Sequence, residues 1–91
     1  MLNLTDGATN AINGLVADRP GAGVRIFPQP TDHDELRLGL AISATPEPTD
    51  EVVEQSGCHV FVDEQVAPLI DGRTLDAVPT EGDRYQFAFL T

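Results

Sequence analysis

A strict alternation of large apolar residues with polar or small ones runs through "ELRLGLAIS", residues 35 to 43. Successive side chains of an extended chain point to opposite faces, so a period of two is typical of a β-strand with one buried face. The aliphatic face of this strand would carry Leu36, Leu38, Leu40 and Ile42. We therefore expect a strand that packs these four side chains into a core.

A helical period precedes this strand. After Thr5, apolar residues recur on one side of a helix, at Ala8, Ala11, Ile12, Leu15 and Val16. Thr5 is suited to cap the N-terminus of that helix, and the negative charge of Asp6 is favourable in its first turn. Pro20 and Gly21 would stop it. The pattern predicts an amphipathic N-terminal helix that ends at this Pro-Gly pair.

The rest of the chain reads as short strands separated by turn residues. We predict strands over residues 23–27, 51–55, 58–63, 73–78 and 84–90, the first of them ended by Pro28 and Pro30. Tyr85, Phe87 and Phe89 would share one face of the last strand. Asp63 can cap a short helical turn over residues 64–70, whose length Pro68 limits.

Ser56 and Gly57 suit a two-residue hairpin loop between two of these strands. The register that follows places Val53 opposite Val60, Glu54 opposite His59 and Gln55 opposite Cys58. The whole pattern predicts an α+β fold, with small curved mixed or antiparallel sheets arranged like a sandwich, the N-terminal helix and a short second helix.

Cys58 is the only cysteine and is adjacent to His59, so the pair is a candidate reactive centre. Strand alternation puts Cys58 on the apolar face with Val60 and Val62, and sends His59 to the opposite face. A nucleophile and its base must lie within hydrogen-bond reach, which neighbours in a strand do not. We interpret Cys58 as a buried core residue and His59 as a cross-strand partner of Glu54.

The loop "TDHDE", residues 31 to 35, is the other candidate site. Asp32, His33 and Asp34 offer an imidazole and hard oxygen ligands that could bind iron or another divalent ion. The alternative is a solvated acidic loop with a lone histidine, since no second histidine lies at ligand spacing. The sequence has no P-loop and no serine in a nucleophile-elbow context, so we predict no catalytic residues and no enzyme activity.

The chain has 91 residues, enough for one small domain, which we assign to residues 1–91. Its formal net charge is -10, with 15 acidic residues against 5 basic ones. Such a surface repels phosphate backbones and anionic membranes, so we exclude nucleic acid and membrane as primary partners. One cysteine and an N-terminus without a charged and apolar leader favour a cytoplasmic location.

Several motifs resemble those of the HesB/IscA family of A-type iron–sulfur carriers, over roughly residues 2 to 89. The chain has "LT" before the helix, "GVRI" after it, the hairpin "DEVVEQSGCHVFVD", and "LIDGRTLDAV" with Gly72, Leu75 and Asp76 in the positions typical of the family. The resemblance implies a HesB-like fold, iron–sulfur cluster biogenesis as the pathway, and assembly into dimers or tetramers.

The three ligand cysteines of the family have no counterpart in these residues. Asp32 or His33 stands about where the first thiolate would be, and the sequence ends at Thr91 before the C-x-C pair that follows the last strand in the family. Because iron–sulfur clusters are held by thiolates, we expect no cluster cofactor. The resemblance then implies a non-catalytic binding or scaffold member with protein partners in that pathway and a homodimeric form.

Overall fold

The computed structural model describes residues 1–29, 37–82 and 84–90. Its elements run in the order β1 (Asn3–Leu4), α1 (Asp6–Leu15), β2 (Gly23–Gln29), β3 (Arg37–Ser43), β4 (Glu51–Gln55), β5 (Cys58–Val62), α2 (Ala67–Ile70), β6 (Thr74–Pro79) and β7 (Tyr85–Leu90). No helix among these residues is long and apolar enough to cross a membrane.

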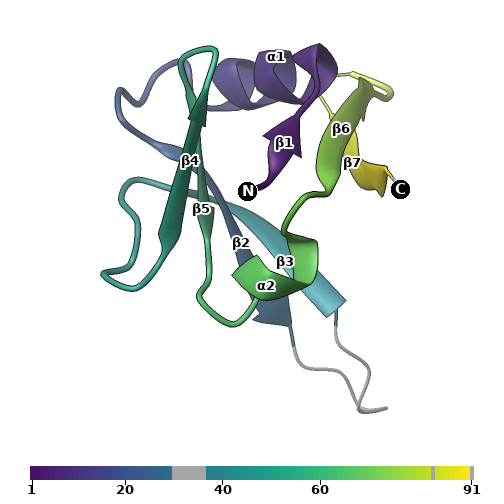
Figure 1. The fold of residues 1–91 in the computed structure, drawn as a ribbon. Coiled ribbons are helices and arrows are strands. Elements are labelled where there is room, and N and C mark those ends of the chain that lie inside the picture. The colour runs from purple at the N-terminus through teal and green to yellow at the C-terminus, as the bar shows by residue number, and fades with distance from the viewer. Residues whose placement is uncertain (30–36, 83, 91) are drawn as a thin grey trace.

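Two small sheets face each other, and α1 closes one end of the space between them (Figure 1). The four-stranded sheet has the order β3-β2-β5-β4, and the three-stranded sheet has the order β1-β6-β7. Both sheets are mixed, because β2 runs parallel to β5 and β1 runs parallel to β6 while the other pairs are antiparallel. The predicted α+β fold with a long and a short helix is confirmed.

The helix α1 begins as predicted but ends early. The Thr5 hydroxyl oxygen accepts a hydrogen bond from the backbone N–H of Ala8 at 3.0 Å, which is the predicted N-cap. The helix stops at Leu15, and residues 16–22 form turns in which Arg19 N–H donates to the Val16 carbonyl. Gly14 lowers the helix propensity just before this end, so the chain leaves the helix before it reaches the Pro-Gly pair.

The strand β2 extends through Pro28 to Gln29, so the prediction that proline ends it was wrong. Its parallel pairing with β5 stops at Ile26, while its antiparallel pairing with β3 continues to Gln29. At Pro28 the strand therefore has one neighbour, and a residue without an N–H is tolerated in a strand that is locally at an edge.

The alternating segment forms β3 over the part that the structure describes, but its aliphatic face is less buried than expected. Leu38 is half-buried, whereas Leu40 and Ile42 are 37% and 42% exposed. Because β3 lies at the edge of the four-stranded sheet, the core covers only part of its apolar face. Period two identified the strand, but it does not distinguish an edge strand from a central one.

The predicted hairpin register is confirmed, with Val53 opposite Val60 and Gln55 opposite Cys58. Ser56 and Gly57 have φ values of 52° and 81°, so both central residues of the turn are left-handed. Turns of this kind match the twist of the flanking strands, and glycine adopts the conformation without steric cost.

The strand β1 was not predicted. Asn3 and Leu4 pair in parallel with Thr74 and Leu75, and two residues are too few to show a periodicity. The side chain of Gln55 holds β1 on its other side, since its amide donates to the Leu4 carbonyl at 2.8 Å and its oxygen accepts from the Leu4 N–H at 3.2 Å.

The second helix is shorter than the predicted turn over 64–70, because α2 covers only Ala67–Ile70. Asp63 still begins this segment, since one of its carboxylate oxygens accepts a hydrogen bond from the Gln65 N–H at 2.8 Å. Its carbonyl accepts from the N–H groups of Val66 and Ala67. The residues between Asp63 and α2 therefore form a hydrogen-bonded turn.

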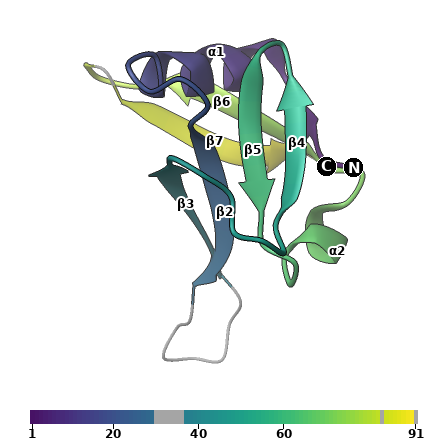
Figure 2. The same ribbon diagram turned by 90° about the vertical axis from the view of Figure 1, so that its left-hand side faces the viewer.

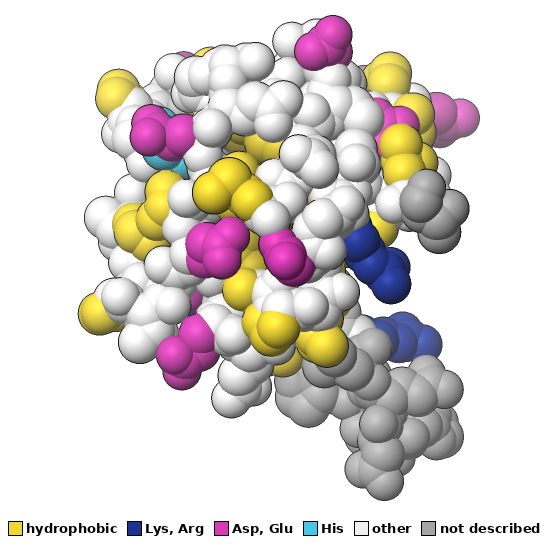
Figure 3. All heavy atoms as spheres, in the orientation of Figure 1, with side chains coloured by type: hydrophobic (Ala, Val, Ile, Leu, Met, Phe, Trp, Pro, Cys, Tyr) yellow, Lys and Arg dark blue, Asp and Glu magenta, His cyan; other side chains and the backbone are white. Residues whose placement is uncertain are grey.

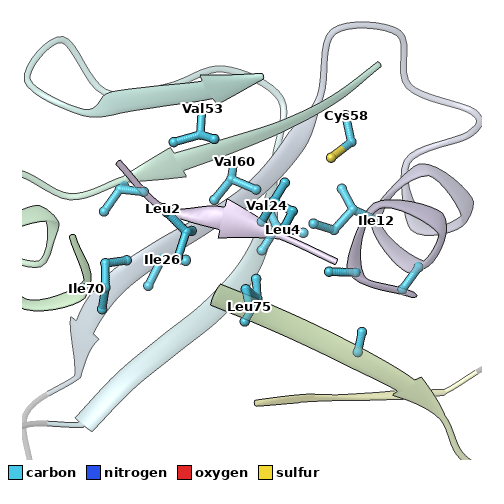
Figure 4. Packing of buried hydrophobic residues seen from close by; sticks show 14 of the residues in the cluster. Leu2, Leu4, Ile12, Val24, Ile26, Val53, Cys58, Val60, Ile70 and Leu75 are labelled. Carbon is cyan, nitrogen blue, oxygen red and sulfur yellow. The ribbon is translucent and has the colours of Figure 1, made fainter. Parts of the chain in front are cut away.

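One apolar cluster fills the space between the sheets and α1 (Figure 4). It includes Leu2, Leu4, Ile12, Val24, Ile26, Val53, Cys58, Val60, Ile70 and Leu75. In the four-stranded sheet, β2, β4 and β5 each contribute a buried aliphatic or thiol side chain to this cluster, whereas the edge strand β3 contributes none that is fully buried. Burial of this apolar surface is the main favourable contribution to folding.

Candidate functional site

The structure places Cys58 inside the apolar cluster. Its side chain is 1% exposed and lies beside Ile12 of α1 (Figure 4). Burial raises the pKa of the Cys58 thiol, because the desolvated site disfavours the charged thiolate. A thiol of this kind is a poor nucleophile and a poor metal ligand, since both roles require the thiolate.

His59 points away from Cys58, to the outer face of the four-stranded sheet. Its imidazole Nε2 lies 2.9 Å from a carboxylate oxygen of Glu54, its cross-strand neighbour, and its ring is tilted beside that of Phe61. The predicted separation of Cys58 and His59 is therefore confirmed. These two residues do not form a joint site.

The second candidate, Asp32, His33 and Asp34, lies outside the described residues. Among the residues that are described, no group of three or more His, Cys, Asp or Glu side chains has the geometry to hold a metal ion.

A partly buried ion-pair network on the outer face of the sheet was not predicted. Arg25, in the middle of β2, contacts Asp50 through two hydrogen bonds, Nε to Oδ2 at 2.9 Å and Nη2 to Oδ1 at 3.0 Å. Its Nη2 also donates to Asp63 Oδ2 at 3.0 Å. The Asp50 side chain is 0% exposed and that of Arg25 is 21% exposed, so this two-point contact is geometrically matched and partly desolvated.

The network fixes the loop that joins β3 to β4. These strands lie at opposite edges of the sheet, so residues 44–50 must cross β2 and β5, as Figure 2 shows. Arg25 holds Asp50 at the end of this crossover loop, and Asp50 in turn accepts a hydrogen bond from the Glu47 N–H at 2.9 Å. The hydrogen bonds from Arg25 lower the pKa of Asp50, because they favour the charged carboxylate.

We assign the network a structural role, because its carboxylates are occupied by Arg25 and by backbone N–H groups. One signal of it was present in the sequence. Arg25 interrupts the apolar strand "GVRIF" at a position that alternates to the outer face. Its partner Asp50 lies 25 residues away in a loop, and no local pattern links the two.

Apolar side chains remain on the surface among acidic ones, as the face shown in Figure 3 illustrates. Leu40 and Ile42 are two of them, and they lie on neighbouring same-face positions of one edge strand. Val52 is 44% exposed on β4, at the other edge of the same sheet. Leu69, Val78 and Leu90 are exposed as well, so the exposed apolar side chains are not confined to this sheet.

Comparison with known proteins places the chain in a family. The iron–sulfur cluster assembly protein SufA of Escherichia coli is 36% identical over 89 residues, which cover 97% of this chain and 72% of SufA. An uncharacterized protein in the nifU 5′ region of Cereibacter sphaeroides is 34% identical over 90 residues, 96% of this chain and 85% of that protein. No family model matches the chain.

Solved structures agree with the sequence comparison. The crystal structure of Escherichia coli SufA, involved in biosynthesis of iron–sulfur clusters, superposes with a TM-score of 0.81 and covers 98% of this chain and 78% of that one. The crystal structure of IscA with the [2Fe-2S] cluster has a TM-score of 0.73 and 27% identity, over 99% of this chain and 81% of that one. The fold is thus that of the small iron–sulfur assembly proteins. The chain belongs to the HesB/IscA family, with SufA and IscA among its relatives.

Proposed function

We propose that these 91 residues act in iron–sulfur cluster assembly as a binding or scaffold member of the family, and hold no thiolate-ligated cluster themselves. The proposal includes protein partners from the same pathway, a homodimeric form and no catalytic activity. We infer a cytoplasmic location from the cysteine content alone, since proteins exported to oxidising compartments at this size usually contain several cysteines.

The observation that carries the proposal is the position of Cys58. A cluster such as the [2Fe-2S] group in the IscA structure is typically held by four thiolates. These residues contain one thiol, and it lies in the core with its pKa raised. To bind iron it would have to leave the apolar cluster and lose a proton, and two copies would still supply only two thiolates.

Anaerobic reconstitution with ferrous iron and sulfide tests this proposal. We expect the 91-residue chain to show, after desalting, the same visible absorbance and iron content as its Cys58→Ala variant, because Cys58 is the only thiol. Escherichia coli SufA treated in parallel checks that the conditions load a cluster. Stoichiometric iron and sulfide on the wild-type chain, lost in Cys58→Ala, would overturn the proposal.

The alternative function is binding of iron or another divalent ion through Asp32, His33 and Asp34, without sulfide. It is supported by the chemistry of the donor set, one imidazole and several carboxylates on a short loop. A ferrous iron titration under anaerobic conditions should then give saturable binding that His33→Ala weakens and Cys58→Ala leaves unchanged. Equal binding by wild type and His33→Ala would rule this alternative out.

A further inference from the structure

Asn13 and Gly14 form an Asn-Gly pair in the last turn of α1. Both residues are exposed, and α1 ends one residue later, at Leu15. Asparagine is a thermolabile residue, because its side-chain amide can react with the backbone nitrogen of the residue that follows it. A glycine in that second position leaves the approach free, since it has no Cβ. Asn3 and Asn10, the other asparagines of the chain, are also exposed but are followed by leucine and alanine.

The Asn13 side chain joins α1 to the β4–β5 hairpin. Its Nδ2 donates a hydrogen bond to the Ser56 carbonyl at 3.2 Å, across 43 residues of sequence, and the hairpin lies beside α1 (Figure 1). An amide can donate to a carbonyl oxygen, whereas an ionised carboxylate has no proton to donate. The contact therefore exists only while residue 13 keeps its side-chain amide.

We propose that Asn13-Gly14 is a site of spontaneous deamidation, and that the reaction breaks the contact between α1 and the hairpin. The Gly14 backbone nitrogen attacks Cγ of the Asn13 side chain. A carbon–nitrogen bond forms to give a cyclic imide, the bond from Cγ to Nδ2 breaks, and the Gly14 amide proton leaves with Nδ2 as ammonia. Water then opens the ring at either carbonyl, which leaves aspartate or isoaspartate at position 13. Water is the co-reactant, and no oxidant or reductant is needed.

The helix slows this reaction, and the nearby helix end allows it. Helical side chains are tilted toward the N-terminus, so Asn13 directs its Cγ away from the nitrogen of Gly14. Ring closure requires residue 13 to leave the helical conformation and to release the Ser56 carbonyl. This opening is local, because the carbonyl groups of a last turn lack helical partners and the turn frays. Gly14 adds backbone freedom at the same point.

The product is destabilised on both sides of the contact. A carboxylate at position 13 would place acceptor oxygens against the Ser56 carbonyl, where a donor had been. It would also add a negative charge near the C-terminal end of α1, which the helix dipole disfavours. Isoaspartate adds a methylene to the main chain and so interrupts the helical hydrogen-bond pattern. The modified chain therefore holds its hairpin turn and its helix end more loosely, whatever its role in cluster assembly.

Mass spectrometry of the chain after incubation tests the proposal. The 91-residue chain is kept in heavy-oxygen water at mildly alkaline pH, and fragmentation locates each amide that has become a labelled carboxyl. We expect Asn13 to react at least about tenfold faster than Asn10, an exposed asparagine of the same helix without a following glycine. Equal rates at Asn13 and Asn10 would overturn the proposal.

Gly14→Ala is the matched variant, because neither backbone nor packing requires a glycine there. Gly14 has no left-handed φ, and an added Cβ would meet nothing closer than the Tyr85 hydroxyl at 3.7 Å. Alanine also strengthens the helix, so the comparison is repeated in denaturant, where the helix is absent. We expect wild type to react faster in denaturant than when folded, and Gly14→Ala to stay slow in both. An unchanged rate for Gly14→Ala in denaturant would overturn the reaction, and equal folded and unfolded rates in wild type would overturn the protection by α1.

Asn13→Asp tests the consequence of the reaction, with Asn10→Asp as its control. Both variants add the same charge to α1, but only Asn13 donates to the Ser56 carbonyl in the hairpin turn. We expect hydrogen exchange at Ser56 and Gly57 to be at least about threefold faster in Asn13→Asp than in Asn10→Asp. Equal exchange in the two variants would contradict the loss of contact between α1 and the hairpin.

Discussion

The Asp50 side chain is 0% exposed although it is one of the charged groups of the chain. Replacing it with asparagine keeps the shape and one acceptor oxygen, but removes the charge that accepts two hydrogen bonds from Arg25 and leaves Asp63 as the remaining counter-charge. We expect Asp50→Asn to lower the free energy of unfolding by about 2–4 kcal/mol, below the range for fully buried pairs because Arg25 is partly solvated. Denaturant unfolding measures the free energy of unfolding of wild type and variant. Glu47→Gln is the surface control, and we expect it to change the free energy of unfolding by less than about 0.5 kcal/mol. Equal midpoints for wild type and Asp50→Asn would show that the pair contributes nothing.

The same residue makes stability depend on pH. Its pKa in the folded chain lies below the ordinary value of 3.8, so its contribution is complete above that value and is lost as the pH falls through the folded pKa. We expect the difference in stability between wild type and Asp50→Asn to be constant near neutrality and to shrink as the pH is lowered below about 4. A difference that stays constant into that acid range would contradict the assigned pKa shift.

Cys58 contributes through packing. Cys58→Ala removes a buried sulfur from the apolar cluster beside Ile12, and we expect a loss of about 1 kcal/mol in the free energy of unfolding. The native thiol should also react slowly with a thiol reagent and react fully once the chain is unfolded in urea. Rapid labelling of the folded chain would show that Cys58 is accessible, and would remove the basis for excluding it as a ligand.

At the scale of the element, two glycines should respond in opposite ways to alanine. Gly57 has a φ of 81° in the hairpin turn, and Gly57→Ala should cost about 1 kcal/mol because a Cβ disfavours that conformation. Gly14 lies in α1, where an added Cβ would meet nothing closer than the Tyr85 hydroxyl at 3.7 Å. Gly14→Ala should therefore stabilise the chain by up to about 1 kcal/mol. Thermal unfolding of both variants checks this prediction. A shift of both unfolding midpoints in the same direction would contradict the conformation assigned to Gly57 or to Gly14.

The elements show which parts of the fold a single sequence can predict. The hairpin register was predictable because Ser56 and Gly57 define a two-residue turn, and α1 because Thr5 and the apolar stripe are local signals. The strand β1 was not, since two residues have no period and are held by distant partners such as Gln55. The exposure of Ile42 was missed for a related reason, because position within a sheet is a property of the whole fold.

The candidate sites show the same difference between local signals and contacts between distant residues. The divergence of Cys58 and His59 could be predicted, because alternation along one strand decides it. The Arg25–Asp50 contact could not, since it joins a strand to a crossover loop whose path depends on the order of strands in the sheet. Contacts that the topology creates need the structure, whereas contacts within one element can be inferred from the sequence.

At the scale of the whole molecule, the chain keeps the family fold, and its one cysteine, Cys58, lies in the core and not on the surface. The fold presents instead an acidic surface, with a net charge of -10, and an apolar edge strand. Two copies with this charge repel each other, so we expect the proposed homodimer to tighten when salt screens that repulsion. A dimer that weakens with added salt would indicate an interface held mainly by ion pairs.

Under the proposed function, the chain associates with proteins and carries no cluster of its own. A native mass spectrum of the 91-residue chain, recorded after anaerobic incubation with iron and sulfide, tests it most directly because it counts chains, iron and sulfur together. We expect the mass of two chains with no added iron or sulfur. A species of two chains carrying the added mass of an iron–sulfur cluster would contradict it.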